Sequence, residues 1–292
     1  LIQEFSDIAM YRAKKDPEHA ICLFEAYMFA EDRARTALKS DLRNALSDKQ
    51  FELHYQLQND IETQEAVGFE VLLRWNHPKL GRVSPYLFIP IAEETGLIRS
   101  IGLWVLRTAC LEAATWNFPY RIAVNVAPQQ LVEAMFVEQV ADVLMESGLA
   151  AERLELEITE ASIIDDHANT LAVMHQLKSM GVRIAMDDFG TGYSSLATLQ
   201  AFPFDKIKID RSFVTDVHHD PRRAAIIRAT VMMGDAMNIP VLAEGVEVAE
   251  ELALLQVEKC REVQGFYFGK PMTHDQMRQF VTQGAPEARK VS

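Results

Sequence analysis

Oxygen-bearing side chains and one lysine stand at the carboxyl ends of a series of short apolar segments. The set comprises Glu70, Asn125, Glu157, Asp187, Asp188, Lys208, Glu244 and Gln264. Carboxylate and amide oxygens are the ligands that Mg²⁺ and Mn²⁺ prefer, in an octahedral geometry completed by water and substrate oxygens. If the ends of these segments meet in space, the residues predict a pocket that binds divalent metal ions.

The adjacent pair Asp187 and Asp188 is the sharpest local signal for such a pocket. Two neighbouring carboxylates can face two metal ions, with Asp187 as a bridge and Asp188 on the second ion. The alternative is that an aspartate at a strand end caps the following helix. That alternative does not account for Glu70, Glu157 or Glu244, because glutamate is not a favoured N-cap residue.

Lys208 lies between Ile207 and Ile209 in an apolar segment, so its charge must be paired or must lie near an open end. Beside two metal ions the ammonium form would be disfavoured. The pKa of Lys208 would then fall toward a value useful for proton transfer or water positioning. The alternative is an ion pair with a carboxylate such as Asp187 or Glu244, and the two interpretations are compatible.

Strand-like and helix-like segments alternate along most of the chain and would position these residues. Segments 51–58 and 67–75 form a hairpin-like pair across the polar stretch 59–66. The later strands are followed by helical patterns, which favours βαβ units and a mostly parallel sheet. The length of this alternation fits a TIM-like (β/α)₈ barrel with one antiparallel strand, whose strand ends form one rim. An open doubly wound sheet is the other candidate, but no G-x-G-x-x-G motif follows the first strand.

The overall charge limits the partners of the chain. Its 292 residues carry a formal net charge of −13, which repels the phosphate backbone of DNA or RNA, so no nucleic-acid polymer is expected as a partner. A small phosphate ligand is compatible with this charge if metal ions or a few cations neutralise it locally.

The cysteine content and the hydropathy of the sequence also indicate the cellular compartment. The cysteines Cys22, Cys110 and Cys260 are odd in number and far apart, which favours a reducing compartment over a disulfide framework or a zinc site. No run of about 18 apolar residues occurs, so we expect a cytoplasmic segment without membrane contact. Because the chain opens on Leu1, a missing upstream region could still anchor the full-length protein to a membrane.

A series of motifs in fixed order resembles the EAL-domain family of cyclic di-GMP phosphodiesterases. The resemblance runs from about Leu42 to Pro271 and comprises YQ at 55–56, E-x-L-x-R-W at 70–75, FIPIAEETGLI at 88–98, VNV at 124–126, LEITE at 156–160, DDFGTGYSSL at 187–196, KID at 208–210, AEGVE at 243–247 and QGFYFGKP at 264–271. It implies a TIM-like barrel with one antiparallel strand. It also implies hydrolysis of cyclic di-GMP to linear pGpG, which lowers the level of this second messenger.

The resemblance further implies two bound ions, Mg²⁺ or Mn²⁺, and a ligand set for each. The ligands of the first ion would be Glu70, Asn125, Glu157 and Asp187. The ligands of the second ion would be Asp187, Asp188 and Glu244.

Other roles follow from the same resemblance. Lys208 would contact or activate the attacking water, Glu244 is a rival for the general base, and Glu70 completes the catalytic set. The implied substrate contacts are Gln56, Arg74 and Gln264. Glu160 is similar to the glutamate that holds the loop 187–196, which in this family also couples the site to a homodimer interface.

Three positions depart from the family pattern: Leu57, Val71 and Ala127 stand where proline, alanine and serine are usual. None of them is a predicted metal ligand, so they would alter substrate affinity more readily than abolish the chemistry. Two other functions stay open. The domain could bind cyclic di-GMP and signal without cleaving it, or it could serve as a dimerising output scaffold. The presence of every predicted ligand favours the enzyme.

The first part of the chain has a different character. The segment DIAMYRAKK resembles the last helix of a GGDEF domain, so residues 1–30 are interpreted as the C-terminal remnant of such a domain. Residues 31–49 are predicted to form a linker helix, with Ala34, Leu38, Leu42 and Leu46 on its apolar face. Residues 50–288 would form the EAL phosphodiesterase domain, as in a tandem GGDEF–EAL protein.

Overall fold

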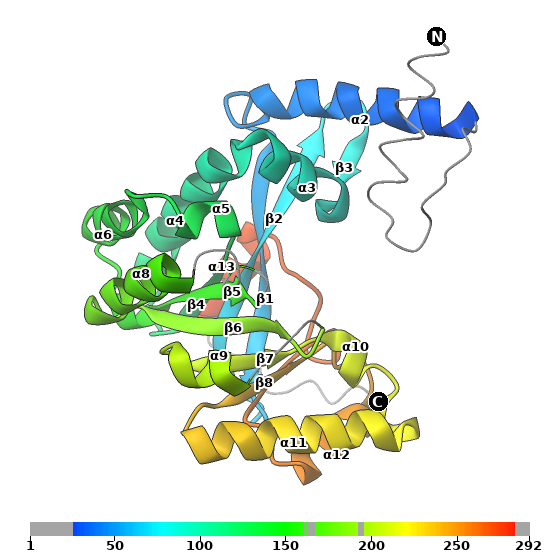
Figure 1. Cartoon of the computed structure of the whole chain (residues 1–292), viewed down its shortest axis with the longest axis vertical. Helices are drawn as coiled ribbons and strands as arrows, with labels where there is room; N and C mark the ends of the chain where they lie inside the picture. Colours follow the sequence, from blue (N-terminus) through cyan, green and yellow to red (C-terminus); the bar gives the residue numbers. More distant parts are fainter. Residues whose placement is uncertain (1–25, 161, 163–166, 192–195, 284–292) are drawn as a thin grey trace. The chain divides into compact units, whose positions relative to one another are not determined.

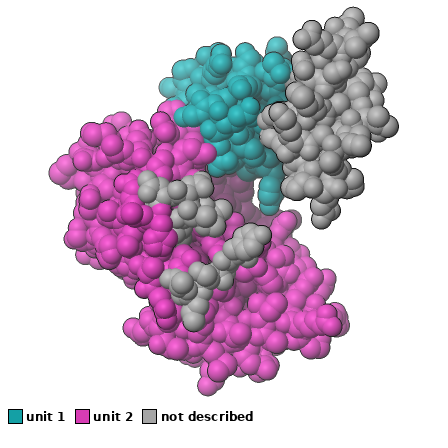
Figure 2. Space-filling view, in the orientation of Figure 1, with its two compact units in different colours: residues 1–51, 75–97 teal, residues 52–74, 98–292 magenta. Residues whose placement is uncertain are grey.

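The computed structural model describes residues 26–160, 162, 167–191 and 196–283 (Figure 1). The chain forms two compact units (Figure 2). Unit 1 comprises Leu1–Phe51 and Trp75–Leu97, and unit 2 comprises Glu52–Arg74 and Ile98–Ser292.

A closed barrel is the central feature of unit 2 and confirms the predicted fold. Its strands are β1 (Phe51–Asp60, with Phe51 in unit 1), β2 (Ala66–His77, with 75–77 in unit 1), β4 (Arg121–Val126), β5 (Leu154–Thr159), β6 (Arg183–Phe189), β7 (Lys206–Ile209), β8 (Val241–Glu244) and β9 (Glu262–Gln264). They are hydrogen-bonded in the order β1-β9-β8-β7-β6-β5-β4-β2, and a pairing between β1 and β2 closes the ring.

Strand direction follows from the lengths of the connections. The strands from β2 through β4 to β9 pair in parallel, whereas β1 is antiparallel to β9. The link from β1 to β2 is a short turn, closed by the Asp60 N–H donating to Glu65 O at 2.9 Å. Such a turn is too short for the crossover that parallel neighbours need, so the hairpin forces one strand to run against the rest.

Helices separate successive parallel strands, as the alternating pattern predicts (Figure 1). In unit 2 they are α4 (Leu97–Ala114, with Leu97 in unit 1), α5 (Pro128–Leu131), α6 (Phe136–Ser147), α8 (His167–Ser179), α9 (Leu196–Ala201), α10 (Arg211–Val214), α11 (Pro221–Met237), α12 (Ala249–Val257) and α13 (His274–Gln283), with short 3₁₀ turns η1 (Ala151–Arg153) and η2 (Val217–His219). None of the helices in the described part of the chain has the length and hydropathy that a membrane span requires.

Local chemistry explains where individual helices begin and end. Asp220 accepts hydrogen bonds from the Arg222 and Arg223 backbone N–H groups at 2.9 and 3.3 Å, and Pro221 follows as the first residue of α11. Helix α6 ends at Gly148, which has a φ of 68°. A left-handed residue after the last turn stops a helix, and glycine adopts it at least cost.

Unit 1 packs the helices α2 (Ala26–Ala45) and α3 (Pro85–Thr95) with the short strand β3 (Gly81–Val83), which pairs with the end of β2. The rings of Phe51, Trp75 and Phe88 form its aromatic core, with centroids 5.6–6.1 Å apart. The predicted linker helix is present as α2. It begins before residue 31 and ends at Ala45.

The apolar face predicted for this helix is only partly correct. Leu38 and Leu42 are buried, together with Ala45, but Leu46 is half-buried and Ala34 is exposed. At the end of the helix the buried face therefore includes Ala45 rather than Leu46. Residues 1–25, which hold most of the predicted GGDEF remnant, lie outside the described residues, and the predicted domain boundaries stay a prediction.

Candidate active site

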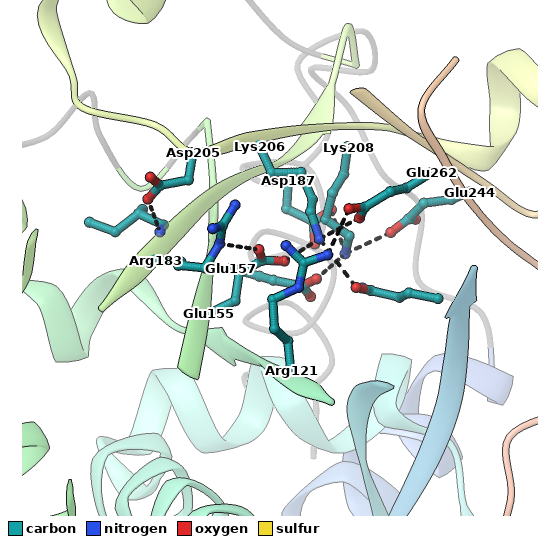
Figure 3. A network of polar contacts seen from close by, with 12 residues as sticks. Arg121, Glu155, Glu157, Arg183, Asp187, Asp205, Lys206, Lys208, Glu244 and Glu262 are labelled. Atoms are coloured by element: carbon teal, nitrogen blue, oxygen red, sulfur yellow. Dashed lines mark hydrogen bonds and ion pairs between the residues drawn. The ribbon is translucent and has the colours of Figure 1, made fainter. Parts of the chain in front are cut away.

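Charged side chains of five parallel strands converge inside the barrel of unit 2, and Figure 3 shows those of β5 to β8. Glu70 comes from β2, Glu157 from β5, Asp187 from β6, Lys208 from β7 and Glu244 from β8. Because side chains alternate along a strand, Lys208 enters the barrel while Ile207 and Ile209 pack outside it. The structure thus brings together residues that are distant in the sequence, as the strand-end pattern predicts.

The ammonium group of Lys208 lies at the centre of this cluster. Its Nζ is 2.8 Å from Glu157 Oε1, 3.1 Å from Asp187 Oδ1 and 2.7 Å from Glu244 Oε1. The Lys208 side chain is 0% exposed, so its charge requires such partners. The ion pairs with Asp187 and Glu244, left open as an alternative by the sequence, are therefore present.

Glu70 is held by two amides rather than by the lysine. Gln264 Nε2 donates to Glu70 Oε2 at 2.5 Å, and Asn125 Nδ2 donates to Glu70 Oε1 at 2.9 Å. Gln264 Nε2 also lies 3.3 Å from Gln56 Oε1. Two of the three predicted substrate contacts, Gln56 and Gln264, are thus connected to a predicted metal ligand by hydrogen bonds.

The carboxylates set the protonation of Lys208. Burial by itself lowers the pKa of Lys208, but the surrounding carboxylates, Asp187 first among them, outweigh it and hold the pKa well above its ordinary value. This direction is opposite to the one expected from the sequence. That expectation assumed two metal ions, whose charge would replace the ammonium as the partner of these carboxylates.

Burial raises the pKa of the buried carboxylic acids, whereas it lowers that of a buried lysine. It raises the pKa of Glu157 well above its ordinary value, and the neighbouring carboxylates add to the shift. Burial likewise raises the pKa of Glu244 to about 8. Burial would also raise the pKa of Glu70, but Lys208 and the two amide donors outweigh it, so that the pKa is lowered. The metal-free cluster therefore holds protons that a divalent cation would displace.

The donor set fits divalent metal ions. Glu157 is 1% exposed, and within the described residues its Oε2 has no well-aligned hydrogen-bond donor, while its Oε1 faces the Lys208 ammonium at 2.8 Å. A buried carboxylate oxygen without a donor can accept a cation, and hard oxygen donors suit Mg²⁺ or Mn²⁺. The described side chains do not, however, form a ready-made group of three or more metal-binding residues. Three of the carboxylates, those of Glu157, Asp187 and Glu244, face the ammonium group of Lys208 instead.

Asp188 enters the site through an irregularity of β6. The pairing of β6 with β7 shifts register between Met186 and Phe189, and Asp188 has a φ of 55°. In a regular strand Asp188 would face away from Asp187, so the bulge re-aims it. Burial raises the pKa of Asp188, and the charges of Asp187 and Asp210 raise it further. Asp188 is thus within electrostatic reach of Asp187, with which it is predicted to bind the second ion, and of Lys208 and Glu70.

The structure does not test the predicted contacts of two further residues, Arg74 and Glu160. Arg74 is half-buried, and its Nη1 donates to Leu73 O at 3.1 Å. Glu160 is buried directly after β5, but part of the loop that it is predicted to support, residues 192–195, lies outside the described residues. The roles assigned to both residues stay predictions.

Sequence reasoning missed a second charged layer (Figure 3), in which Lys206 and Glu155 lie two residues before Lys208 and Glu157 on the same strands. Lys206 Nζ is 2.6 Å from Glu155 Oε1, 2.8 Å from Glu262 Oε2 and 3.2 Å from Gln58 Oε1. Arg121 Nη2 closes the layer on Glu262 Oε1 at 2.7 Å. The available signal was the period-two repeat of charge, because residues two apart on a strand share a face.

The closed barrel and the acidic cluster define a TIM-like barrel protein with a candidate metal-dependent site. Residues 39–271 match the EAL domain, and the chain belongs to this family. The bifunctional diguanylate cyclase/cyclic di-GMP phosphodiesterase MucR of Pseudomonas aeruginosa is 40% identical over 276 residues, which cover 93% of this chain and 40% of MucR. The cyclic di-GMP phosphodiesterase PdeR of Escherichia coli is 37% identical over 270 residues, covering 91% of this chain and 41% of PdeR.

A solved structure supports the same relationship. The MucR phosphodiesterase in complex with c-di-GMP superposes with a TM-score of 0.80 at 41% identity, covering 82% of this chain and 99% of that one. The chain spans about two fifths of the length of the curated relatives named above, at 40% and 41%.

Proposed function

We propose that this chain hydrolyses cyclic di-GMP to linear pGpG and requires two Mg²⁺ or Mn²⁺ ions. The observation that supports it most directly is the meeting of Glu157, Asp187 and Glu244 within 3.1 Å of one buried lysine. The cluster lies at the carboxyl ends of parallel barrel strands, where enzymes of this architecture place their functional residues. The names of the related proteins agree with this activity.

Substrate binding has to overcome the charge of the protein. Cyclic di-GMP carries two phosphodiesters, and the chain has a net charge of −13. When bound, the metal ions would neutralise the phosphate, lower the pKa of a bound water and stabilise the leaving oxygen. Glu70, Asn125, Glu157, Asp187, Asp188 and Glu244 would hold them. Arg74 can donate a forked pair of hydrogen bonds to a phosphate oxygen, and Gln56 and Gln264 can donate to the substrate through their amides.

The reaction we propose is an in-line displacement. Water attacks phosphorus, the bond from phosphorus to the ribose O3′ breaks, and the product carries a free 3′ hydroxyl and a 5′ phosphate. Lys208 Nζ lies 2.7 Å from Glu244 Oε1. These two side chains are the candidates for accepting the proton of the attacking water. Burial raises the pKa of Glu244 to about 8 in the metal-free cluster, and a bound metal ion would lower it toward the deprotonated form that can accept a proton.

Nucleotide analysis of purified protein tests this proposal. Incubation of cyclic di-GMP with the protein and Mg²⁺ or Mn²⁺ should yield pGpG, and the Glu70→Ala variant should yield none. Exchange of an exposed carboxylate remote from the site, Glu146→Ala, serves as the matched control and should leave turnover unchanged. Intact substrate with measurable binding would instead support the cyclic di-GMP-binding effector. The absence of binding would support the scaffold.

One observation favours the effector alternative. The ammonium group of Lys208 already forms ion pairs with three carboxylates. If Lys208 keeps these ion pairs, the carboxylates are not available as ligands and the chain would bind metal ions poorly. Binding of cyclic di-GMP that is equally tight with Mn²⁺ and with a chelator would favour this alternative. The effector and the enzyme are thus separated by the metal dependence of binding as well as by product formation.

The organisation of the longer protein is part of the same proposal. Residues 1–30 would be the remnant of a GGDEF domain, 31–49 a linker and 50–288 the phosphodiesterase domain, which would act as a cytoplasmic homodimer. Light scattering of the purified chain tests the dimer directly. If the chain has a monomeric mass at micromolar concentrations and still cleaves cyclic di-GMP, dimerisation is not required for activity and this part of the proposal is wrong.

A further inference from the structure

Glu251 joins two turns at the carboxyl ends of the strands. It is the third residue of α12 and is 3% exposed. Its Oε1 accepts a hydrogen bond from the Asp216 backbone N–H at 2.9 Å. Its Oε2 accepts from the Glu247 N–H at 2.8 Å and from the Val248 N–H at 3.3 Å. One buried carboxylate therefore binds main-chain donors of two separate segments.

These segments follow two strands of the candidate site. The segment that ends at Asp216 follows β7, which carries Lys208, and the segment 245–248 follows β8, which ends at Glu244. The segments also touch near the strands. Gly245 has a φ of 77°, and a Cβ added there would lie 2.5 Å from Arg211 Cβ. The two turns are thus packed together at one end and joined by Glu251 at the other.

Ordinary helix capping explains only half of this arrangement. A glutamate at the third position of a helix commonly accepts from the amide of the N-cap residue, as Oε2 does with Val248. Capping does not require Oε1 to bind Asp216, which lies 35 residues earlier in the chain. Asp216 also holds a left-handed φ of 57°, which costs a non-glycine residue free energy and which the bond to Glu251 helps to maintain.

We propose that Glu251 is a positioning residue that fixes Glu244 relative to Lys208. The distance of 2.7 Å between Glu244 Oε1 and Lys208 Nζ depends on how the ends of β7 and β8 lie against each other (Figure 3). Loss of the Glu251 carboxylate would free the turn after Glu244 and weaken a metal site that uses Glu244 as a ligand. The effect on metal binding depends on the function proposed above, whereas the joining of the two turns does not.

Matched variants on one helix test this proposal. Glu251→Gln keeps the shape of the side chain but places an NH₂ group against one of the two sets of N–H donors. Glu250→Gln removes the same charge from the exposed neighbouring position. Hydrogen exchange of the metal-free proteins should be faster at the amides of Asp216, Glu247 and Val248 in Glu251→Gln only. Amides of β5 should exchange as in the wild type in both variants.

Mn²⁺ binding supplies the second readout. A titration of free Mn²⁺ by electron paramagnetic resonance should show roughly 10-fold weaker binding of at least one ion in Glu251→Gln, as for other residues that orient metal ligands. Glu250→Gln should bind Mn²⁺ as the wild type does. In turnover assays the loss in Glu251→Gln should be recovered by excess Mn²⁺, which a general loss of folded protein would not allow.

The outcomes separate the two proposals. Unchanged exchange at the three amides in Glu251→Gln would overturn the joining of the turns. Faster exchange with unchanged Mn²⁺ binding would show a purely structural contact and would overturn the positioning role. If the wild type binds Mn²⁺ but does not cleave cyclic di-GMP, the proposed function fails while both readouts still decide the role of Glu251.

Discussion

Lys208 Nζ lies 2.7 Å from Glu244 Oε1 on the neighbouring strand, and the Lys208 side chain is fully buried whereas that of Glu244 is 19% exposed. The Glu244 carboxylate is also a predicted ligand of the second metal ion. The ammonium and the metal therefore compete for one acidic cluster.

Removal of the lysine charge should destabilise the metal-free protein. In Lys208→Met the carboxylates lose their buried counter-charge, at an expected cost of about 3–5 kcal/mol. The loss should be largest at high pH, where Glu157 and Glu244 cannot take up protons instead. Denaturant unfolding in the presence of a chelator measures it.

Mn²⁺ should restore much of that stability but not the activity, because the metal replaces the charge and not the proton-handling group. Lys206→Met is the matched control, since Lys206 is equally buried in the layer below, away from the predicted ligands. It should be destabilised without recovery by Mn²⁺. Equal recovery of the two variants would contradict the assignment of the metal site to the Lys208 layer.

Metal affinity should rise with pH. Burial raises the pKa of Glu244 to about 8, and the metal binds only the deprotonated carboxylate. Mn²⁺ binding should therefore release protons and tighten as the pH increases toward about 8. Calorimetric titrations in two buffers of different ionisation enthalpy measure the number of protons released, and a value of zero at neutral pH would contradict the shift.

The same group should affect the stability of the metal-free protein with the opposite sign. An acid whose pKa is higher in the folded state binds its proton more tightly there. Its contribution is present below the ordinary value of 4.5 and is lost as the pH rises through about 8. Thermal unfolding with a chelator should show a smaller loss over this range in Glu244→Gln than in the wild type.

The two described cysteines should be unreactive in the folded protein. Burial raises the pKa of Cys110 to about 12 and that of Cys260 to about 12, so almost no thiolate forms near neutral pH. In a Cys22→Ser background, Ellman's reagent should label neither thiol until the protein is unfolded by denaturant. Rapid labelling of either thiol under native conditions would show that the barrel opens locally around it.

Alanine substitutions at two glycines should distinguish the cost of a left-handed backbone conformation from the cost of a steric clash. Gly148 and Gly245 both have positive φ values, of 68° and 77°, but only at Gly245 would an added Cβ meet another residue. Gly148→Ala should cost about 1–2 kcal/mol for the left-handed conformation alone. Gly245→Ala should cost more, because Arg211 blocks the Cβ, and it should also weaken Mn²⁺ binding through Glu244. Equal effects of the two substitutions would contradict the packing of Gly245 against Arg211.

Much of the barrel can be predicted from local patterns. The polar stretch 59–66 is too short for a crossover and thereby predicts the antiparallel β1, and carboxylates such as Glu157 and Glu244 mark strand ends that must meet. The bulge that turns Asp188 into the site could not be predicted, because it depends on a φ of 55° that no residue pattern encodes.

Other features depend on contacts between distant parts of the chain. The pairing of Lys206 with Glu155 and Glu262 follows only when the register of the strands is known. The hydrogen bond from the Asp216 N–H to Glu251 likewise links a turn to a helix residue 35 positions later in the chain. The lowered pKa of Lys208 is predicted for a site that holds two metal ions and stays a prediction, whereas in the metal-free protein the carboxylates raise it.

The central claim is metal-dependent cleavage of cyclic di-GMP, and chromatographic analysis of the nucleotides after incubation with the wild-type chain tests it most directly. With Mn²⁺ the account predicts conversion of cyclic di-GMP to pGpG, and with Mn²⁺ plus excess chelator it predicts none. Unchanged cyclic di-GMP under both conditions, or equal conversion with and without the chelator, would contradict it.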